Sequence, residues 1–137
     1  MAKHANFRFS TRELGQRIQQ ELQRMPDKTK KAMDGVGGYI NGEVRKRTPV
    51  DEGHLTASIT NETVVYEKSH AMVIYVPSNS AASEYAIAMH ENNYNIGPDS
   101  QMKQAKTGKT VGKKYISRAL DENHDRIIRI IQKEMNV

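Results

Sequence analysis

His90 and Glu91 are adjacent residues of types that occur in catalytic sites. In the H-E-x-x-H motif of zinc peptidases, two histidines on one helix face bind the metal and the glutamate acts as general base. Position 94 is Tyr94 here, so the second ligand is missing. The remaining histidines do not pair at the spacing of zinc ligands; they are His4, His54, His70 and His124. The sequence therefore predicts no metal site.

Thr107-Gly-Lys-Thr110 is similar to the end of a phosphate-binding loop. The full pattern, G-x-x-x-x-G-K-[ST], requires a glycine at position 103, and the chain has Lys103 there. No strand is expected before this segment either. Nucleotide hydrolysis is therefore not expected.

A catalytic carboxylate pair could be drawn from Asp51, Glu52 and Glu91, because glycosidase sites use two such groups. Nothing in the sequence brings these three residues together. Acidic residues beside a Pro–Gly turn usually act as caps or turn formers. We therefore predict that the protein is not an enzyme and has no catalytic residues and no cofactor.

The strongest electrostatic feature lies between residues 100 and 120, where no acidic residue occurs before Asp121. Such a segment could contact DNA phosphates, order on an acidic protein surface, or remain solvated. Aromatic side chains for base stacking are absent between Tyr94 and Tyr115, which argues against single-strand readout. The basic residues are Lys103, Lys106, Lys109, Lys113, Lys114 and Arg118.

Two helices are expected before these residues. Ser10 and Glu13 have capping-box spacing, Phe9 and Leu14 have the spacing of a hydrophobic staple, and Pro26 should end a helix over 11–25. A second helix is expected over about 28–47, with Met33, Val36, Ile40 and Val44 on one face.

Three glycines, Gly35, Gly38 and Gly42, fall on the opposite face of the second helix. Each interior glycine costs about 1 kcal/mol relative to alanine. We therefore interpret this face as a place where another backbone approaches closely, such as that of a second subunit. The alternative is a helix that is kinked or broken around Gly37-Gly38.

Thr48-Pro49 should stop the second helix, and Asp51-Glu-Gly53 should turn the chain. Gly53 is expected to need a backbone conformation that favours glycine, with Leu55 and Ile59 buried behind it. Residues 59–66 and 72–76 predict an antiparallel hairpin joined by 67–71. A polar loop over 77–84 and a short helix over 85–92 should follow.

The last third of the chain combines a predicted loop with a predicted helix. Residues 93–113 show no usable periodicity, and we expect a long, mobile basic loop there. One amphipathic helix is predicted over about 114–135, with Arg118, Asp125, Arg129 and Lys133 facing away from its apolar stripe. That stripe comprises Ile116, Leu120, Ile127 and Ile131, widened by Ile128 and Ile130.

Composition limits the function classes. The chain has 137 residues, which fit one domain over 1–137, and no internal repeat is apparent. Only 36% of residues are hydrophobic and none is Trp, so burial of surface against neighbouring subunits would help to stabilise so lean a core. No cysteine is present, which excludes disulfides. The net charge of +5 permits contact with nucleic acid without requiring it. No run approaches the roughly 20 apolar residues of a membrane span, and MAKHANFRF lacks the apolar core of a signal peptide.

Three segments, in this order and spacing, resemble the small head–tail joining proteins of long-tailed bacteriophages, which include tail-completion, neck and minor tail proteins. The first is the Pro-Val-Asp-x-Gly-x-Leu-x-x-Ser-Ile turn, the second a Tyr-Ala-x-x-x-Glu-x-Gly element with Asn93 in place of the glycine, and the third the start of the last helix. The resemblance spans about residues 10–133. The matched positions are Pro49, Val50, Asp51, Gly53, Leu55, Ser58 and Ile59, then Tyr85, Ala86 and Glu91, then Tyr115, Ile116, Ala119 and Leu120.

The resemblance implies an α+β fold, with a small antiparallel sheet packed against a long N-terminal helical segment and a C-terminal amphipathic helix. It implies a virion protein of the neck, assembled in the host cytoplasm, whose copies form a ring, of six by analogy. Expected partners are a head-proximal connector or stopper protein and a tail terminator or tail tube protein, with non-specific contact to packaged DNA and no membrane. The expected subunit interface comprises the three glycines and the lysines of the basic segment.

Three other functions compete with this one. A tail terminator, which caps the tube, belongs to the same class of protein, and the sequence does not separate it from a joining protein. A basic DNA-binding accessory protein would account for the charge but not for the Pro-Val-Asp-Glu-Gly turn. A small hydrolase has no support from the residues.

Overall fold

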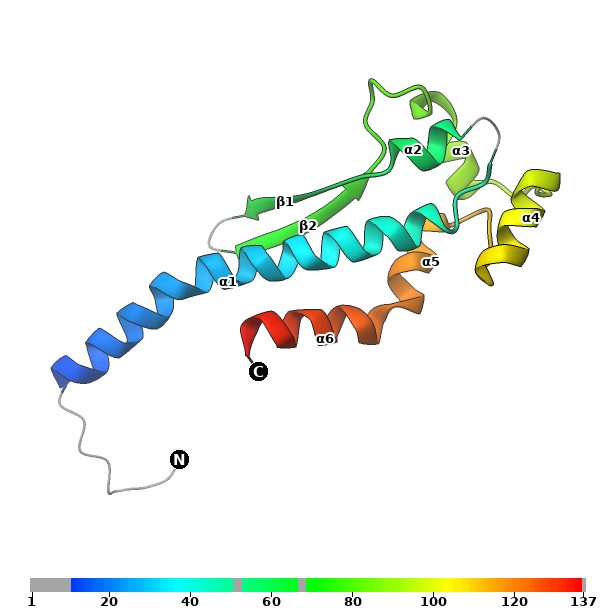
Figure 1. Cartoon of the computed structure of the whole chain (residues 1–137). Helices are drawn as coiled ribbons and strands as arrows, with labels where there is room; N and C mark the ends of the chain where they lie inside the picture. Colours follow the sequence, from blue (N-terminus) through cyan, green and yellow to red (C-terminus); the bar gives the residue numbers. More distant parts are fainter. Residues whose placement is uncertain (1–10, 51–52, 67–68, 137) are drawn as a thin grey trace.

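The computed structural model describes residues 11–50, 53–66 and 69–136. These residues form six helices and a two-stranded antiparallel sheet, which is the predicted α+β class. The long helix α1 (Thr11–Arg45) lies between the hairpin on one side and α6 on the other (Figure 1). The short helices α2, α3 and α4 gather around the C-terminal end of α1 (Figure 1).

Helix α1 is continuous, and the predicted break at Pro26 is wrong. A proline removes its own N–H bond, but its fixed φ of about −65° is helical, so a helix can pass through it. The proposed cap at Ser10 and the staple residue Phe9 lie outside the described residues. The break considered around Gly37-Gly38 is absent as well, because the helix continues through both residues.

The predicted apolar face of α1 is confirmed. Val36, Ile40 and Val44 are buried, and Met33 packs against them from the edge. This face contacts the hairpin, α5 and α6, so one stripe of a single helix organises the core.

The hairpin consists of β1 (Thr60–Tyr66) and β2 (Ser69–Tyr75), paired in the register Thr63↔Met72. The prediction of a hairpin is confirmed, although β2 begins three residues earlier than expected. Met72 and Ile74 point to the core on α1. Polar contacts hold the same face, because Thr63 donates to Asp34 at 2.5 Å and Asn41 donates to Asn61 at 2.8 Å.

Helices α2 (His54–Ser58) and α3 (Ser83–Glu91) flank the hairpin in the sequence. The short helix expected near residues 85–92 is confirmed as α3. Helix α2 was not predicted, because its five residues are too few to show a helical period.

Helix α4 (Pro98–Thr107) occupies the middle of residues 93–113, where one long loop was predicted, so that prediction is wrong there. Pro98 occupies the first turn, and Gly108 ends the helix with a left-handed φ of 70°. Proline just inside the start and glycine just past the end are known helix boundaries. These two residues were therefore a usable signal that the missing apolar period concealed.

The predicted single helix over 114–135 is two helices, α5 (Tyr115–Glu122) and α6 (His124–Met135). They join at Asn123, whose φ of −113° is not helical. The amide of Asn123 donates to Ala119 O at 2.9 Å and to Glu43 Oε1 at 3.1 Å, and its oxygen accepts from Tyr39 Oη at 2.8 Å. Contacts with α1 therefore stabilise the bend that turns α6 back along α1.

The apolar stripe of these two helices is largely as predicted. Ile116, Leu120, Ile127, Ile130 and Ile131 pack against the core, whereas Ile128 is exposed. Within the described part of the chain, no helix is long and apolar enough to cross a membrane.

Candidate functional site

The predicted turn after α1 has the expected conformation. Gly53 has a φ of 84°, the left-handed region that favours glycine, and it precedes α2 directly. Leu55 and Ile59 are each 2% exposed, which confirms their predicted burial. Pro49 lines a small cavity close to this turn. Asp51 and Glu52 lie outside the described residues, so a carboxylate pair that includes them cannot be placed.

Tyr115 links the second and third segments of the resemblance. Its side chain is buried at 1% exposure, and its hydroxyl donates to Ala86 O at 2.6 Å. Burial raises the pKa of Tyr115 to about 12, so the phenol stays neutral and donates this bond. The residue therefore joins α5 to α3 and is not available as a catalytic acid near neutral pH.

His90, Glu91 and Lys114 form a chain of polar contacts. His90 Nδ1 lies 2.6 Å from Glu91 Oε2, and Lys114 Nζ lies 2.5 Å from the same oxygen. The hydrogen bond from Lys114, followed by that from His90, lowers the pKa of Glu91. A carboxylate held ionised by two neighbours is a poor general acid. The described residues contain no cluster of histidines or carboxylates that could hold a metal ion.

The Thr107–Thr110 segment ends a helix. Gly108 is the left-handed cap of α4, and its N–H donates to Gln104 O at 2.9 Å. Phosphate-binding loops instead lie at the start of a helix, where free N–H groups point towards the anion. The geometry here gives no support for a nucleotide site.

A buried cation is the main polar feature that the sequence did not indicate. Arg47 is fully buried, and its guanidinium donates to Glu122 Oε1 at 2.8 Å and 3.1 Å. It also donates to the backbone oxygen of Glu43 at 2.6 Å and lies 3.3 Å from the Glu43 carboxylate. Arg47 therefore joins the end of α1 to the end of α5.

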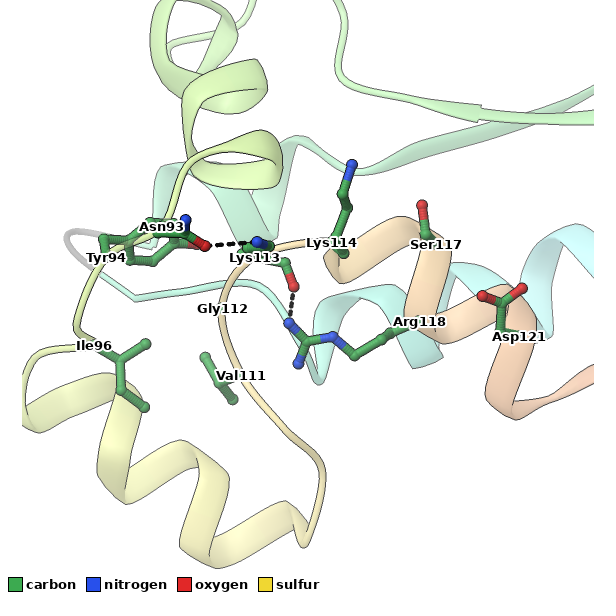
Figure 2. Close-up of a pocket in the computed structure, with 10 residues that line it drawn as sticks. All are labelled: Asn93, Tyr94, Ile96, Val111, Gly112, Lys113, Lys114, Ser117, Arg118 and Asp121. Carbon is green, nitrogen blue, oxygen red and sulfur yellow. Dashed lines mark hydrogen bonds between the residues drawn. The ribbon is translucent and has the colours of Figure 1, made fainter.

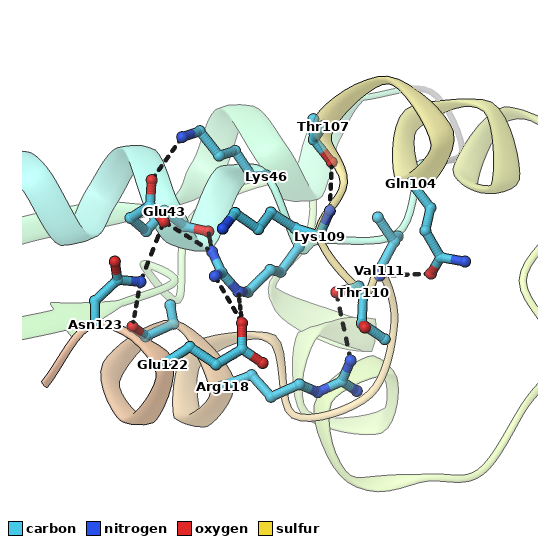
Figure 3. A network of polar contacts seen from close by, with 12 residues as sticks. Glu43, Lys46, Gln104, Thr107, Lys109, Thr110, Val111, Arg118, Glu122 and Asn123 are labelled. Atoms are coloured by element: carbon cyan, nitrogen blue, oxygen red, sulfur yellow. Dashed lines mark hydrogen bonds and ion pairs between the residues drawn. The ribbon is translucent and has the colours of Figure 1, made fainter.

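The carboxylate of Glu43 collects further contacts around Arg47. Lys46 Nζ lies 2.6 Å from Glu43 Oε2, and Asn123 donates to Glu43 Oε1 (Figure 3). Burial opposes ionisation of Glu43, but the hydrogen bonds from Lys46 and Asn123 outweigh it and lower the pKa of Glu43. We name Glu43, Lys46, Arg47, Glu122 and Asn123 the Arg47 network.

Lys103 is half-buried, and its amine reaches residues at the end of α1 and in α2. Its amine donates to Thr48 O at 2.7 Å, Thr48 Oγ1 at 3.0 Å and Thr56 Oγ1 at 3.3 Å. Burial lowers the pKa of Lys103 to about 8. A cation at the last carbonyls of a helix is favourably placed, so Lys103 ties α4 to the C-terminal end of α1.

A pocket of ≈ 660 Å³ lies beside the start of α5, and three cations of the predicted basic segment line it (Figure 2). Lys113 Nζ donates to Asn93 Oδ1 at 2.6 Å, and Arg118 donates to the Lys113 carbonyl. Lys114 reaches Glu91, as described above, and Asp121 also lines the pocket. We name this the basic pocket. Its chemistry suits an anionic group such as a carboxylate or phosphate.

The other lysines of the predicted interface lie nearby. Lys106 is exposed in the last turn of α4, and Lys109 is half-buried just after the helix, where its N–H donates to Thr107 Oγ1. The structure therefore separates the basic segment into one internal cation, the pocket cations and two cations on or just after α4.

The glycines of α1 have different environments. A Cβ on Gly35 would lie 3.3 Å from Ile130 of α6, whereas Gly38 and Gly42 are exposed with open space beside them. The closest approach involves Gly37, which the sequence did not single out. A Cβ there would lie 2.6 Å from Asn61 Nδ2 and 3.2 Å from Met72 Cγ. The hairpin thus approaches α1 at Gly37, and a role for Gly38 and Gly42 in subunit contact stays a prediction.

Comparison of the chain with protein-family models, with curated proteins and with solved structures gave no match.

Proposed function

We propose that this protein is a structural subunit of the neck of a long-tailed bacteriophage, where its copies form a ring that joins or completes the tail. The proposal rests on the resemblance of three separate segments to head–tail joining proteins. It assigns the chain no catalytic role.

One observation carries the proposal furthest. The three segments of the resemblance are distant in the sequence, yet Leu55, Ile59, Ala86, Tyr115 and Ala119 belong to one buried cluster. The matched positions come from three separate segments, and these members pack together although they lie far apart in the sequence. Their convergence supports the interpretation that the matched positions specify a shared fold.

The shape and composition of the described chain agree with a subunit that buries further surface against neighbouring copies. Helix α1 has 35 residues and is therefore on the order of 50 Å long. Four of the buried hydrophobic residues in the described chain are alanines, which bury little apolar area each: Ala32, Ala82, Ala86 and Ala119. A two-stranded sheet is also marginally stable by itself. Contacts between copies would add the missing burial.

A basic DNA-binding accessory protein receives less support. Lys103 is engaged internally, Lys114 pairs with Glu91, and Arg118 is held on backbone oxygens. The cations therefore do not form a continuous stripe that could follow a phosphate backbone. We favour a carboxylate of a neighbouring protein as the group that approaches the basic pocket.

Electron microscopy tests the proposal at two levels. A map of the phage particle should contain density for this chain at the head–tail junction, and a map without it there would exclude the neck role. Particles that lack the protein then distinguish the two structural roles. Tails of normal length that are not joined to heads support joining or completion, whereas tails of irregular length support a terminator.

A further inference from the structure

A second cavity, a groove of ≈ 780 Å³, lies between α3 and α5. Nearly all of its lining residues differ from those of the basic pocket. Its apolar wall is formed by Val76, Ala86, Ile87 and Ile116. Ile87 is 75% exposed although it lies within a helix. An exposed branched side chain in a mostly apolar groove indicates a binding surface more than an isolated surface residue does.

The groove also has an acidic side. Glu84 and Glu91 line it, three residues before and four residues after Ile87, so both carboxylates lie on the same face of α3 as Ile87. Glu91 is already paired with Lys114. Glu84 is exposed and forms no ion pair with another described residue. The groove therefore suits an apolar side chain that is adjacent to a cation.

The chain itself carries such a segment. Its two phenylalanines, Phe7 and Phe9, both precede α1, so none remains for the core. Arg8 stands between them, Lys3 comes before, and the first ten residues contain no carboxylate. Phenylalanine gains much from burial and is a costly residue to leave in water.

Distance decides whether this segment can reach the groove of its own chain. The groove lies beside the C-terminal end of α1, since Gly112 N, next to α5, donates to Arg47 O and Tyr115 donates to Ala86 O. Thr11 and Val44 are separated along α1 by about 50 Å. Phe7 precedes Thr11 by four residues, which span at most about 14 Å. A span of about 14 Å cannot cover a separation of about 50 Å, so Phe7 cannot reach the groove of its own chain.

We propose that the segment before α1 docks in the groove between α3 and α5 of a second copy of this chain, with Phe7 against Ile87 and Ile116 and with Arg8 beside Glu84. The contact joins unlike surfaces of two copies. Such a head-to-tail contact produces a ring if its rotation closes. The inference goes beyond the neck role, because it holds for any assembly of this chain.

Disulfide trapping between full-length chains tests this contact, because the natural sequence contains no cysteine. A chain carrying Phe7→Cys is mixed with a chain carrying Ile87→Cys under mild oxidation. We expect the mixed disulfide to form at least about tenfold faster than with Val65→Cys, since docking raises the local concentration of the two thiols. Val65 is a matched control because it is 72% exposed and lies on the hairpin.

Charge exchange gives an independent readout. Glu84→Lys in the Ile87→Cys chain should slow trapping, and adding Arg8→Glu to the Phe7→Cys chain should restore it. Equal trapping rates at positions 87 and 65 would overturn the proposal. An internal disulfide in a monomer that carries both cysteines would also overturn it, because the segment would then reach its own groove.

The outcome is separable from that of the neck proposal. A failure of trapping leaves a ring assembled through other surfaces. Absence of the chain from the neck would leave a positive trapping result intact.

Discussion

At the scale of residues, the buried charge of Arg47 has the largest consequence for stability. A guanidinium with no exposed surface is tolerated only when its donors are matched, and Glu43 and Glu122 supply both charge and acceptors. Because these partners come from α1 and α5, Arg47 makes the closure of the fold depend on a polar contact as well as on apolar packing.

Removal of Arg47 should therefore be costly. We expect Arg47→Ala to lower the free energy of unfolding by about 3–5 kcal/mol, because it breaks the ion pair with Glu122 and removes a cation that faces the buried carboxylate of Glu43. Lys46→Ala serves as the control, since Lys46 contacts the same carboxylate but is exposed, and it should cost less than about 1 kcal/mol. Chemical denaturation measures both values, and similar losses would refute a special role for Arg47.

The lowered pKa of Lys103 predicts that the stability of the protein depends on pH in an unusual way. Its pKa is about 8 in the folded chain and 10.5 when unperturbed, so the unfolded state binds more protons between these values. Its contribution should therefore increase stability as pH rises from about 8 towards 10.5, and this gain is lost as pH falls through 8. Tyr115 acts in the opposite direction above pH 10, because its pKa is raised to about 12.

Denaturation curves measured from pH 7.5 to 9.5 test this contribution before Tyr115 opposes it. Lys103→Met should flatten the rise in stability. The exposed Lys106→Met, on the same helix, should leave the rise unchanged. A profile that Lys103→Met does not alter would mean that another group titrates.

At the scale of elements, the two adjacent glycines of α1 separate helix propensity from packing. Gly38→Ala should stabilise the protein by about 0.5–1 kcal/mol, because alanine favours the helix and the added methyl meets open space. Gly37→Ala should instead destabilise it by about 1–3 kcal/mol, because the methyl would displace the amide of Asn61 from its bond with Asn41 and press on Met72. Thermal melting of the two variants compares them directly, and a gain at both positions would contradict the close approach of the hairpin.

At the scale of the whole molecule, two cations at the end of α4 test assembly apart from folding: Lys106 is exposed in its last turn, and Lys109 is half-buried just after it. Under the neck proposal, Lys106→Glu combined with Lys109→Glu should reduce infectious particles by at least about tenfold, because a like charge would face an acidic neighbour. The isolated protein should keep its melting temperature. Lys31→Glu combined with Lys133→Glu is the control, since it makes the same charge change at exposed positions of α1 and α6. An equal loss of titre with both pairs would indicate an effect of net charge alone.

The sequence by itself determined the features that depend on local pattern. The stripe from Met33 to Val44, the glycine turn at Gly53, the hairpin and the apolar positions from Ile116 to Ile131 all follow from periodicity and turn chemistry, because each residue responds to its chain neighbours. Pro98 and Gly108 carried such a signal for α4 as well, and the polar composition between them concealed it.

The tertiary structure alone decided which polar residues lie inside. Arg47 ends the run Arg45-Lys46-Arg47, and Lys103 belongs to a basic segment, so both resemble solvated cations in the sequence. Arg47 is buried where Glu122 accepts its hydrogen bonds, and Lys103 is half-buried where Thr48 and Thr56 accept its hydrogen bonds. These acceptors are separated from the two cations by many positions in the chain. The bend at Asn123 likewise depends on hydrogen bonds with residues of α1 that are distant in the sequence. A polar group can be buried only where distant residues supply its hydrogen bonds, and those residues come together only when the chain folds.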